Sequence, residues 1–314
     1  MKAVQILGDV SSPKIAITES ISRPIPTNAD ILVQVHAAGI TGDEVTWPEV
    51  YQTPTRIPGH DISGTMVAFG PDYDGPLIIG QDVFAMIAAD RGEGQAEYVI
   101  CKPEEVAPKP TSLSHAEAAV LPIPALTAWE AITEHSTVTS DMRVLVTGAS
   151  GSVGRLFVQL VKHLKSAHVI ALASKRNHDL LKGLGADEVI DYTSPNWETS
   201  TKNVDLVFDT VSGEVLSKAW GTVKPDGSII TVGDPAPAWA FTDEKAPESL
   251  IYPGVKYKHF ILSPNAERLA QVASMVDEGS LKPLAVQTFP FEQGVEAWDH
   301  ARQRGRDYKV AIEF

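Results

Sequence analysis

The chain of 314 residues contains a single cysteine, Cys101. One cysteine forms no disulfide within the chain and excludes a structural metal site built from several cysteines. This composition favours a reducing compartment. Basic residues are also scarce. The chain has 26 lysines and arginines but 40 aspartates and glutamates, which gives a net charge of -14. An acidic surface repels phosphate backbones and anionic lipid, so we expect neither nucleic acid nor membrane as a partner.

Long apolar runs are absent as well. No segment has the unbroken apolar length of a membrane span. The opening Met1–Gly8 stretch is typical of a strand rather than of a secretory signal. We therefore expect a cytoplasmic protein. Hydrophobic residues make up 43% of the chain, which is enough for a sizeable core, and the length favours two domains.

The most informative pattern that is present runs from Arg143 to Gly154. A short apolar strand leads into glycines at positions 148, 151 and 154, and an amphipathic helical pattern begins at Ser152. In a dinucleotide site with this context, the first glycine makes the turn and the second admits the pyrophosphate. The third lets the helix pack on the strand, and the phosphate lies at the positive end of the helix dipole. The alternative is a tight strand-to-helix turn that binds nothing.

Three zones follow one another along the chain. Residues 1–121 alternate as half-buried strands separated by proline and glycine, which predicts a β-barrel. Residues 122–258 alternate buried strands with helices, which predicts a doubly wound parallel sheet. Residues 259–314 contain a strand at 259–262, a helix near 266–278 and strand-like pieces at 285–289 and 309–314. We predict an α/β chain in which 1–121 plus 259–314 form one domain and 122–258 form the cofactor-binding domain.

Selectivity for NADPH over NADH is predicted from the end of the second strand of the cofactor-binding domain. An NAD site usually has an acid there to hold the ribose 2′-hydroxyl. This chain instead has Ser174, Lys175 and Arg176, and the first acid, Asp179, lies inside the following helix. One hydroxyl and two cations suit a 2′-phosphate, because charge-assisted bonds to phosphate are strong. The alternative is an exposed basic turn without a ligand.

Two further residues have both a functional and a structural interpretation. Tyr192 ends the third strand, where its ring is placed to cover the adenosine ribose, and the alternative is a partly buried surface tyrosine. Thr127 lies on the first turn of a helix that we predict to begin at Leu126. Its hydroxyl contacts the nicotinamide ribose or a phosphate, caps the helix, or does both. The predicted cofactor-binding residues are Thr41, Thr127, Gly148, Ser150, Gly151, Ser152, Val153, Gly154, Ser174, Lys175, Arg176, Tyr192, Val211 and Gly233.

A series of motifs distributed almost from end to end carries a resemblance to a known family. The motifs are Ala38-Gly39-Ile40, Ile57-Pro-Gly-His-Asp61, Gly80-Gln-Asp-Val-Phe84, Gly94-Gln-Ala-Glu-Tyr98, Leu126-Thr-Ala-Trp129, Gly148-Ala-Ser-Gly-Ser-Val-Gly154, Leu184-Gly-Ala-Asp187, Phe208-Asp-Thr-Val211 and Pro225-Asp-Gly-Ser228. With them the chain resembles a medium-chain dehydrogenase/reductase, specifically one of the zinc-independent quinone oxidoreductase and enoyl reductase branch. The resemblance implies a GroES-like β-barrel catalytic domain, built from both chain ends, with a Rossmann domain inserted into it.

The same resemblance bears on a metal. Zinc alcohol dehydrogenases of this superfamily place a cysteine ligand where this chain has Thr41, and a further cysteine ligand near Ile123. Their histidine ligand matches His60. Only one of three protein ligands is thus retained, whereas catalytic zinc normally needs three. We therefore expect no metal, and His60 as a hydrogen-bonded polar residue.

Without a metal, carbonyl reduction lacks its usual Lewis acid, whereas a conjugated acceptor needs less help. The predicted function is NADPH-dependent hydride transfer to a small apolar quinone, α,β-unsaturated ketone or enoyl thioester. Tyr51 and Thr127 are the candidate catalytic hydroxyls, with Trp47 as a wall of the pocket. The alternative is a cofactor-binding protein of the same fold that has little turnover and acts through interactions. The strand at 259–262 is a candidate edge for a homodimer.

Overall fold

The computed structural model describes all 314 residues, and they divide into two compact units. Unit 1 comprises Met1–Leu126 and Ser263–Phe314, and unit 2 comprises Thr127–Leu262. Unit 1 therefore contains both ends of the chain, whereas unit 2 is one continuous segment. The divisions fall after residues 126 and 262, a few residues beyond the divisions after 121 and 258 that the sequence predicts.

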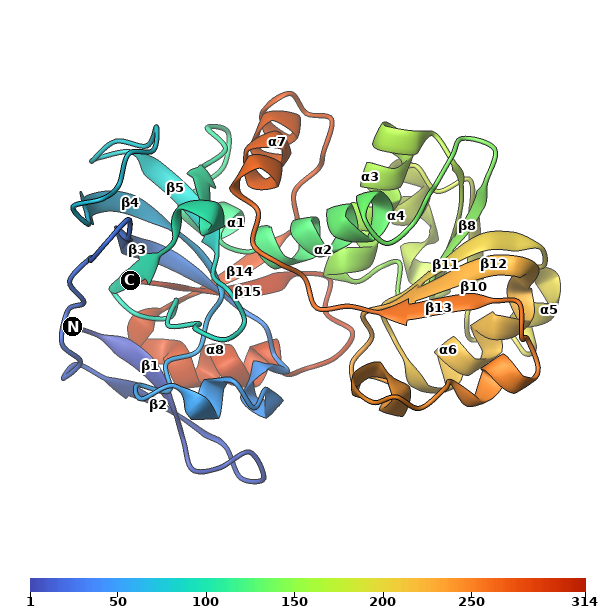
Figure 1. Ribbon diagram of the computed structural model, residues 1–314, viewed down its shortest axis with the longest axis horizontal. Helices are drawn as coiled ribbons and strands as arrows, with labels where there is room; N and C mark the ends of the chain where they lie inside the picture. The colour runs from blue at the N-terminus through green and yellow to red at the C-terminus, as the bar shows by residue number, and fades with distance from the viewer. The chain divides into compact units, whose positions relative to one another are not determined.

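Unit 2 is built on a six-stranded sheet with the order β10-β9-β8-β11-β12-β13 (Figure 1). Every pairing in it is parallel. In chain order the strands run 3-2-1-4-5-6, so the direction of winding reverses between β8 and β11, where such sheets bind their ligands. The strands are β8 Arg143–Val146, β9 His168–Ala173, β10 Glu188–Asp191, β11 Val204–Asp209, β12 Val223–Thr231 and β13 Lys256–His259.

Helices cover both faces of this sheet, which explains why its central strands β8, β9 and β11 consist mostly of buried apolar residues. Figure 1 shows α3 and α4 on one side and α5 and α6 on the other. On the first side, the rings of Phe157 in α3 and Phe208 in β11 stack with centroids 4.1 Å apart. On the other side, Trp197, Leu216 and Trp220 pack in one buried cluster with strand residues. The helices are α3 Ser152–Lys165, α4 His178–Gly183, α5 Trp197–Ser200 and α6 Gly213–Ala219.

Unit 1 contains a seven-stranded sheet in which β3 pairs with three neighbours. The order is β14-β15-β3-β4-β5-β7, and β6 pairs with the other end of β3. The pairing of β15 with β3 is antiparallel and joins the last strand of the chain to the N-terminal strands. The strands are β3 Ile31–Ile40, β4 Asp61–Phe69, β5 Asp82–Met86, β6 Tyr98–Cys101, β7 Val106–Pro108, β14 Val286–Pro290 and β15 Lys309–Glu313, and a separate hairpin is formed by β1 Ala3–Leu7 and β2 Lys14–Thr18.

Four helices complete the description, and the division between the units falls within one of them. They are α1 His115–Ala118, α2 Pro122–Thr133, α7 Ala266–Asp277 and α8 Gly294–Ala301. The sequence predicts α7 within one residue, but it does not predict α8. α8 is held through Trp298, which is fully buried and donates its indole N–H to Gln95 Oε1 at 2.8 Å. No helix in the structure combines the length and the apolar content that a bilayer crossing requires.

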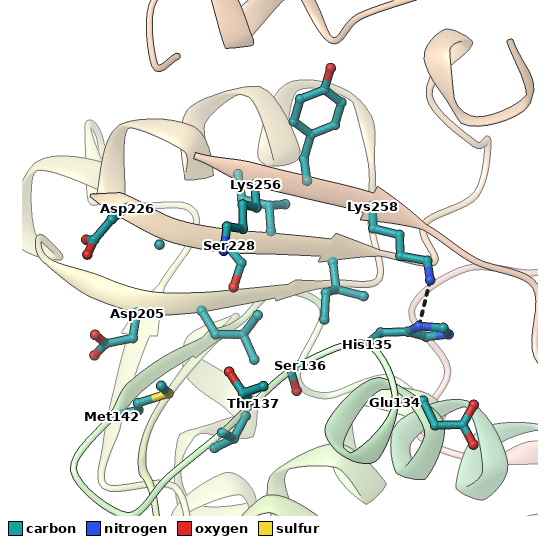
Figure 2. Close-up of a pocket in the computed structure, with 16 residues that line it drawn as sticks. Glu134, His135, Ser136, Thr137, Met142, Asp205, Asp226, Ser228, Lys256 and Lys258 are labelled. Carbon is teal, nitrogen blue, oxygen red and sulfur yellow. Dashed lines mark hydrogen bonds between the residues drawn. The ribbon is translucent and has the colours of Figure 1, made fainter. Parts of the chain in front are cut away.

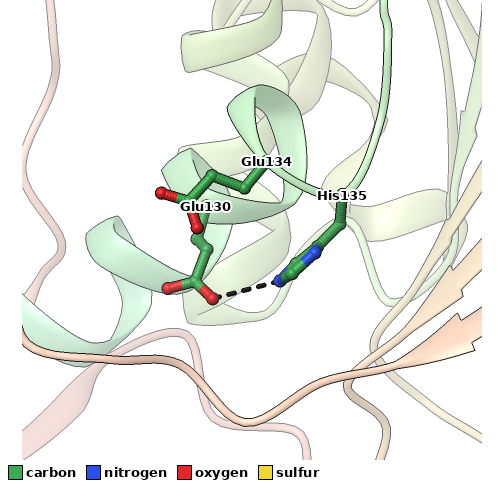
Figure 3. A group of neighbouring side chains, drawn as sticks. All are labelled: Glu130, Glu134 and His135. Carbon is green, nitrogen blue, oxygen red and sulfur yellow. Dashed lines mark hydrogen bonds and ion pairs between the residues drawn. The ribbon is translucent and has the colours of Figure 1, made fainter.

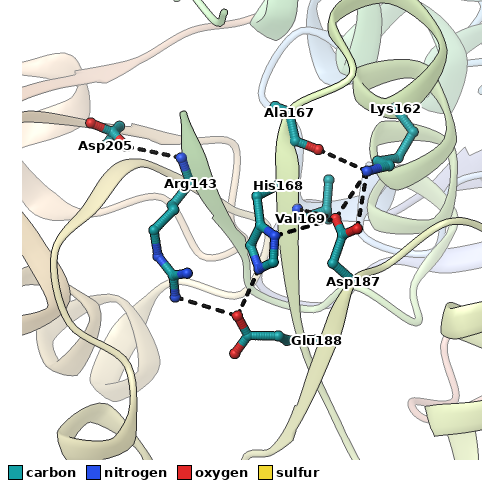
Figure 4. A network of polar contacts seen from close by, with 8 residues as sticks. All are labelled: Arg143, Lys162, Ala167, His168, Val169, Asp187, Glu188 and Asp205. Atoms are coloured by element: carbon teal, nitrogen blue, oxygen red, sulfur yellow. Dashed lines mark hydrogen bonds and ion pairs between the residues drawn. The ribbon is translucent and has the colours of Figure 1, made fainter. Parts of the chain in front are cut away.

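A polar network joins the amino ends of β8, β9 and β10, at the edge of the sheet opposite the glycine turn (Figure 4). Asp187 accepts hydrogen bonds from Val169 N at 2.7 Å and from Lys162 Nζ at 3.0 Å. His168 Nε2 lies 2.6 Å from Glu188 Oε1. Burial opposes ionisation of Asp187, but the bond from Val169 and the charge of Lys162 outweigh it and hold the pKa below its ordinary value. Ionised Asp187 therefore stabilises the fold.

We expect Asp187→Asn to lower the free energy of unfolding by about 1 kcal/mol near neutral pH, because the side chain is partly exposed and solvent screens its charge. A carboxyl with a depressed folded pKa contributes stability above its unfolded pKa, near 4, and loses it as the pH falls through the folded pKa. The difference from wild type should therefore shrink below pH 4. Urea unfolding from pH 7 to pH 3 measures this, with the exposed Asp243→Asn as control. A pH-independent difference would contradict the assignment.

Candidate functional site

The glycine turn after β8 has the backbone geometry that the sequence predicts for a phosphate site. Gly148 has a φ of +58°, and a Cβ built on it would lie 2.3 Å from Thr210 Oγ1. A Cβ on Gly154 would lie 2.5 Å from the carbonyl oxygen of Gly148, so both positions require glycine. Gly151 is exposed and has no side chain to cap α3, whose N-terminus it forms. The first N–H groups of α3 are thus suited to an anion.

Asp209 is the buried carboxylate that fixes this turn. It ends β11 with no solvent exposure. Its Oδ1 accepts from the Thr147 hydroxyl, and its Oδ2 accepts from the Thr231 hydroxyl at 2.7 Å. Its Oδ1 also accepts from Val211 N at 3.3 Å and its Oδ2 from Ser212 N at 3.0 Å. One carboxylate therefore ties together the carboxyl ends of β8, β11 and β12.

Sequence reasoning missed Asp209, although it noted the motif that contains it. The signal was an acidic residue at the end of a strand that is otherwise buried. Such a charge is retained only if hydrogen bonds compensate for its burial, and the partners here come from strands far apart in the sequence. The neighbouring predicted residues Val211 and Gly233 follow β11 and β12. A Cβ on Gly233 would lie 2.5 Å from Ser212 N, so the loops after these strands pack closely.

The predicted 2′-phosphate residues lie after β9, at the same edge of the sheet. Ser174 is half-buried and its hydroxyl accepts from Asn177 Nδ2 at 3.2 Å, whereas Lys175 and Arg176 are exposed. Tyr192 follows β10 and is 52% exposed, which leaves its ring accessible. Asp191 lies near His178 and Lys175, since bonds from Thr193 and the charges of these two residues lower its pKa.

The structure places the remaining predicted residues of unit 2 as follows. Ser152 and Val153 open α3, and Ser150 precedes them, with its carbonyl accepting from Arg155 Nε at 2.7 Å. Thr127 is 5% exposed and lies in the second turn of α2, because that helix begins at Pro122 rather than at Leu126. The interpretation of Thr127 as a helix cap is therefore wrong, since two prolines in the first turn do not prevent the helix from starting earlier.

In unit 1, the structure gives Tyr51 a partner. Its hydroxyl donates to the Val45 carbonyl oxygen at 2.6 Å, and burial raises its pKa. The hydroxyl proton of Tyr51 is thus already used in a hydrogen bond to the backbone. Trp47 packs in the same region, with its ring 5.2 Å from that of His60. Thr41 is half-buried directly after β3.

His60 is 2% exposed and has an oxygen atom facing each ring nitrogen. Nδ1 lies 3.0 Å from Glu44 Oε1, and Nε2 lies 3.3 Å from the Ala89 carbonyl oxygen. Burial alone would lower the pKa of His60, but Glu44 and the Ala89 carbonyl outweigh it and raise that pKa. Glu44 also accepts from Gly59 N at 2.6 Å. Each ring nitrogen of His60 therefore has an oxygen atom nearby, from Glu44 and from Ala89.

Asp61, the next residue, accepts from Ile123 N at 2.8 Å and is almost completely buried. Burial raises its pKa to about 7, although Lys309 and the Ile123 N–H act in the opposite direction. The backbone of Ile123 is thus engaged by a carboxylate, and its side chain is a hydrocarbon.

Unit 2 also has a pocket of about 480 Å³ and a group of possible metal ligands, neither of which the sequence predicts. The pocket is lined by β11, β12, β13 and the segment 134–142, and none of residues 148–154 lines it (Figure 2). Glu130, Glu134 and His135 bring ligand atoms within 4.8 Å of one another (Figure 3). His135 Nε2 lies 3.1 Å from Glu130 Oε1, and Lys258 Nζ donates to His135 Nδ1 at 2.9 Å.

Comparisons with known proteins agree with this architecture. A family model described as the alcohol dehydrogenase GroES-like domain matches residues 27–111, and one described as a zinc-binding dehydrogenase matches residues 184–312. A probable mitochondrial zinc-binding oxidoreductase of Arthroderma benhamiae is 32% identical over 93% of this chain and 92% of its own length. The chain belongs to the medium-chain dehydrogenase/reductase superfamily.

Three further proteins that are similar to this chain are named as NAD(P)H or quinone oxidoreductases. A mitochondrial NAD(P)H oxidoreductase of Danio rerio is 32% identical over 91% of this chain and 84% of its own length. A chloroplastic quinone-oxidoreductase homologue of Spinacia oleracea is 29% identical over all of this chain and 98% of its own length. The solved quinone oxidoreductase of Coxiella burnetii superposes with a TM-score of 0.85 at 26% identity, covering both chains completely.

These findings confirm the resemblance and the predicted fold class, a GroES-like β-barrel domain with a Rossmann domain. The protein is an oxidoreductase of the medium-chain dehydrogenase/reductase superfamily, and its fold and relatives indicate a nicotinamide cofactor. The prediction of a cytoplasmic location is wrong, because the relatives are named mitochondrial or chloroplastic. It relied on the lack of a membrane span and of a secretory signal and on the single cysteine, which is compatible with any reducing compartment.

We expect Asp209→Asn to weaken the binding of NADPH at least tenfold and to lower the free energy of unfolding by about 2 kcal/mol. An asparagine amide nitrogen cannot accept, so two of the four donors around position 209 lose their acceptor inside the protein. Fluorescence titration with NADPH and urea unfolding measure the two effects.

The control is Asp226→Asn, an exposed change on β12 that should leave both quantities as in wild type. Unchanged cofactor affinity in a folded Asp209→Asn protein would show that the carboxylate does not position the turn.

Proposed function

We propose that the protein is an NADPH-dependent reductase of a small conjugated acceptor, a quinone, an α,β-unsaturated ketone or an enoyl thioester, and that it transfers hydride directly without zinc. The glycine turn, whose glycines 148 and 154 admit no side chain, is the observation that carries the proposal. The names of the quinone-oxidoreductase relatives support the class of acceptor.

Selectivity for NADPH is supported by the residues after β9. A 2′-phosphate brings about two negative charges, and Lys175 and Arg176 are both exposed beside the half-buried Ser174 hydroxyl. Asp191 shares this edge and faces Lys175. We propose that both cations meet the phosphate.

Zinc independence is supported by the donor set in unit 1. Thr41 and Ile123 offer neither thiolate nor imidazole to a zinc ion. His60, the third position, has an oxygen atom against each ring nitrogen and is fully buried with Glu44. A zinc ligand needs a nitrogen lone pair directed at the ion, whereas Nδ1 lies 3.0 Å from Glu44 Oε1 and Nε2 lies 3.3 Å from the Ala89 carbonyl oxygen. The description of one matching family model as zinc-binding therefore does not extend to the residues of this chain.

The chemistry without a metal depends on the acceptor. The reduced nicotinamide, when bound, supplies the hydride. In a conjugated acceptor the charge spreads to an oxygen that a hydroxyl or a backbone N–H stabilises. We propose Thr127 and Tyr51 for this orienting role. Tyr51 has to release the Val45 carbonyl before it donates its proton.

A homodimer through the outer edge of unit 2 is also part of the proposal. β13 pairs only with β12, so its other edge is unpaired within the chain. Ile251 and Ile261, on either side of this strand, are 73% and 55% exposed. β13 occupies Lys256–His259 rather than the predicted 259–262.

The function is tested by NADPH oxidation with a panel of quinones, enones, enoyl thioesters and simple ketones. We expect turnover with conjugated acceptors and none with simple ketones, and we expect 1,10-phenanthroline to leave the rate unchanged. If NADPH binds tightly but none of the acceptors supports its oxidation, the alternative of a binding protein with little turnover is favoured. Loss of activity with the chelator, restored by zinc, would refute zinc independence.

The cofactor assignment is tested by Lys175→Ala combined with Arg176→Ala. We expect the dissociation constant for NADPH to rise about tenfold to a hundredfold, as charge-assisted bonds to the phosphate are lost, and that for NADH to change less than twofold. Lys245→Ala combined with Lys256→Ala removes two exposed cations of the same unit and serves as control. Equal losses for both cofactors would contradict a 2′-phosphate site.

A further inference from the structure

Glu44 is a fully buried acid in unit 1, although it opens a short 3-10 helix, Glu44–Thr46, in the segment between β3 and β4. Its Oε1 accepts a hydrogen bond from Gly59 N at 2.6 Å and lies 3.0 Å from His60 Nδ1. Burial of a carboxylate is tolerated only where such partners compensate for the lost water. One oxygen atom of Glu44 therefore ties its own helix to the residues directly before β4, fifteen positions away in the sequence.

The backbone around Glu44 forms a compact turn centred on this acid. Glu44 N donates to the Thr41 carbonyl oxygen at 3.1 Å, and Trp47 N donates to the Glu44 carbonyl oxygen at 3.0 Å. The indole N–H of Trp47 also donates to Asp43 Oδ2 at 3.2 Å. The path of the chain from Thr41 to Trp47 is thus fixed by local hydrogen bonds, and the side chain of Glu44 anchors that path to the barrel.

Two aromatic residues, Trp47 and Tyr51, are held by the immediate neighbours of Glu44, and we call them the acceptor wall. The Trp47 ring lies 5.2 Å from the ring of His60, which Glu44 contacts. The Tyr51 hydroxyl donates at 2.6 Å to the carbonyl oxygen of Val45, the buried residue that follows Glu44. Both rings pack against one buried cluster that contains Val45. The orientation of the wall therefore depends on the position of Glu44.

Stability alone does not explain an acid at this position. The second carboxylate oxygen, Glu44 Oε2, is buried and has no hydrogen-bond partner. A buried acid paired with a histidine costs desolvation of both groups, and an apolar side chain of similar volume is often equally stable or more stable there. The contacts to Gly59 and His60 do, however, specify one arrangement of the loop, which an apolar side chain does not.

We propose that Glu44 is a positioning residue for the acceptor: its buried carboxylate, through Gly59 and His60, holds Trp47 and Tyr51 as the wall against which a planar conjugated acceptor binds. The inference rests on the proposed function, which assigns these two aromatic residues to the acceptor side. Stacking on an aromatic wall contributes to binding. Because Glu44 itself exchanges no proton or hydride, its loss should act on the KM for the acceptor rather than on kcat.

The kinetic test compares Glu44→Gln with wild type, using NADPH and 1,4-naphthoquinone. The glutamine keeps the volume and one acceptor oxygen but removes the charge. We expect the KM for the quinone to rise about fivefold, whereas kcat and the KM for NADPH change less than about twofold. Glu49→Gln removes an acid of the same loop whose side chain makes no capping hydrogen bond, and it should match wild type.

A double-mutant comparison separates positioning of the wall from a general loosening of the barrel. We expect Trp47→Ala to raise the KM for the quinone by itself. Adding Glu44→Gln to that variant should then raise the KM by less than about twofold, because the two residues act through the same wall and their effects are not additive. Independent, multiplying effects would contradict the proposal.

A second readout needs neither turnover nor cofactor. The chain contains six tryptophans, and labelling with 5-fluorotryptophan gives each a fluorine resonance, with that of Trp47 assigned through Trp47→Phe. We expect Glu44→Gln to shift or broaden the Trp47 resonance and to leave that of Trp197, in unit 2, unchanged. If circular dichroism shows Glu44→Gln to be unfolded, His60→Gln, which removes the imidazole but leaves the Gly59 contact, is used with the same expectations.

A Trp47 resonance that does not move in the folded variant overturns the proposal, as does an unchanged KM in an active variant. A loss confined to kcat overturns it too. Wild-type protein that turns over no acceptor defeats the proposed function alone. In that case the fluorine spectrum still decides whether Glu44 holds the wall, because a moved resonance supports that role and an unmoved one overturns it.

Discussion

Asp209 accepts four hydrogen bonds at the carboxyl edge of the unit 2 sheet, from two threonine hydroxyls and two backbone N–H groups. A buried carboxylate is tolerated only with such compensation. Here the compensating donors are the ends of β8 and β12 and the loop after β11, which are also the segments around the predicted cofactor. The arrangement of the strand ends and loops at this edge therefore depends on the buried carboxylate of Asp209. Gly148 fits against Thr210 because the same network holds Thr210 in place through Thr147.

The sequence predicts the parts of the fold that depend on local pattern. The glycine spacing and the amphipathic run of Ser152–Lys165 specify α3, and the apolar run at β9 specifies a strand buried on both faces. It does not predict α8 or the true start of α2. α8 begins at Gly294 without a side-chain cap, and α2 contains two prolines in its first turn. Asp209 was missed for a similar reason, because its partners are brought together only by the strand order.

Three histidines show why a residue type does not by itself define a site. The two nitrogens of His60 face a carboxylate and a carbonyl, those of His135 face a carboxylate and an ammonium, and those of His115 face a hydroxyl and a carboxylate. The first is almost completely buried beside a carboxylate, the second accepts a hydrogen bond from a lysine, and the third is partly exposed beside Asp82. Only the neighbours, which come from distant segments, distinguish these states, so the sequence alone cannot.

The pairing of β15 with β3 has a consequence for biosynthesis. Unit 2 is one continuous segment, so all of its strands have been made once the ribosome passes residue 262. Unit 1 lacks β14 and β15 at that stage, and the Ile40 end of β3 has no partner on the β15 side. Domains generally fold as units during synthesis. The inserted unit therefore completes its fold first, and the barrel that begins the chain is the last part to close.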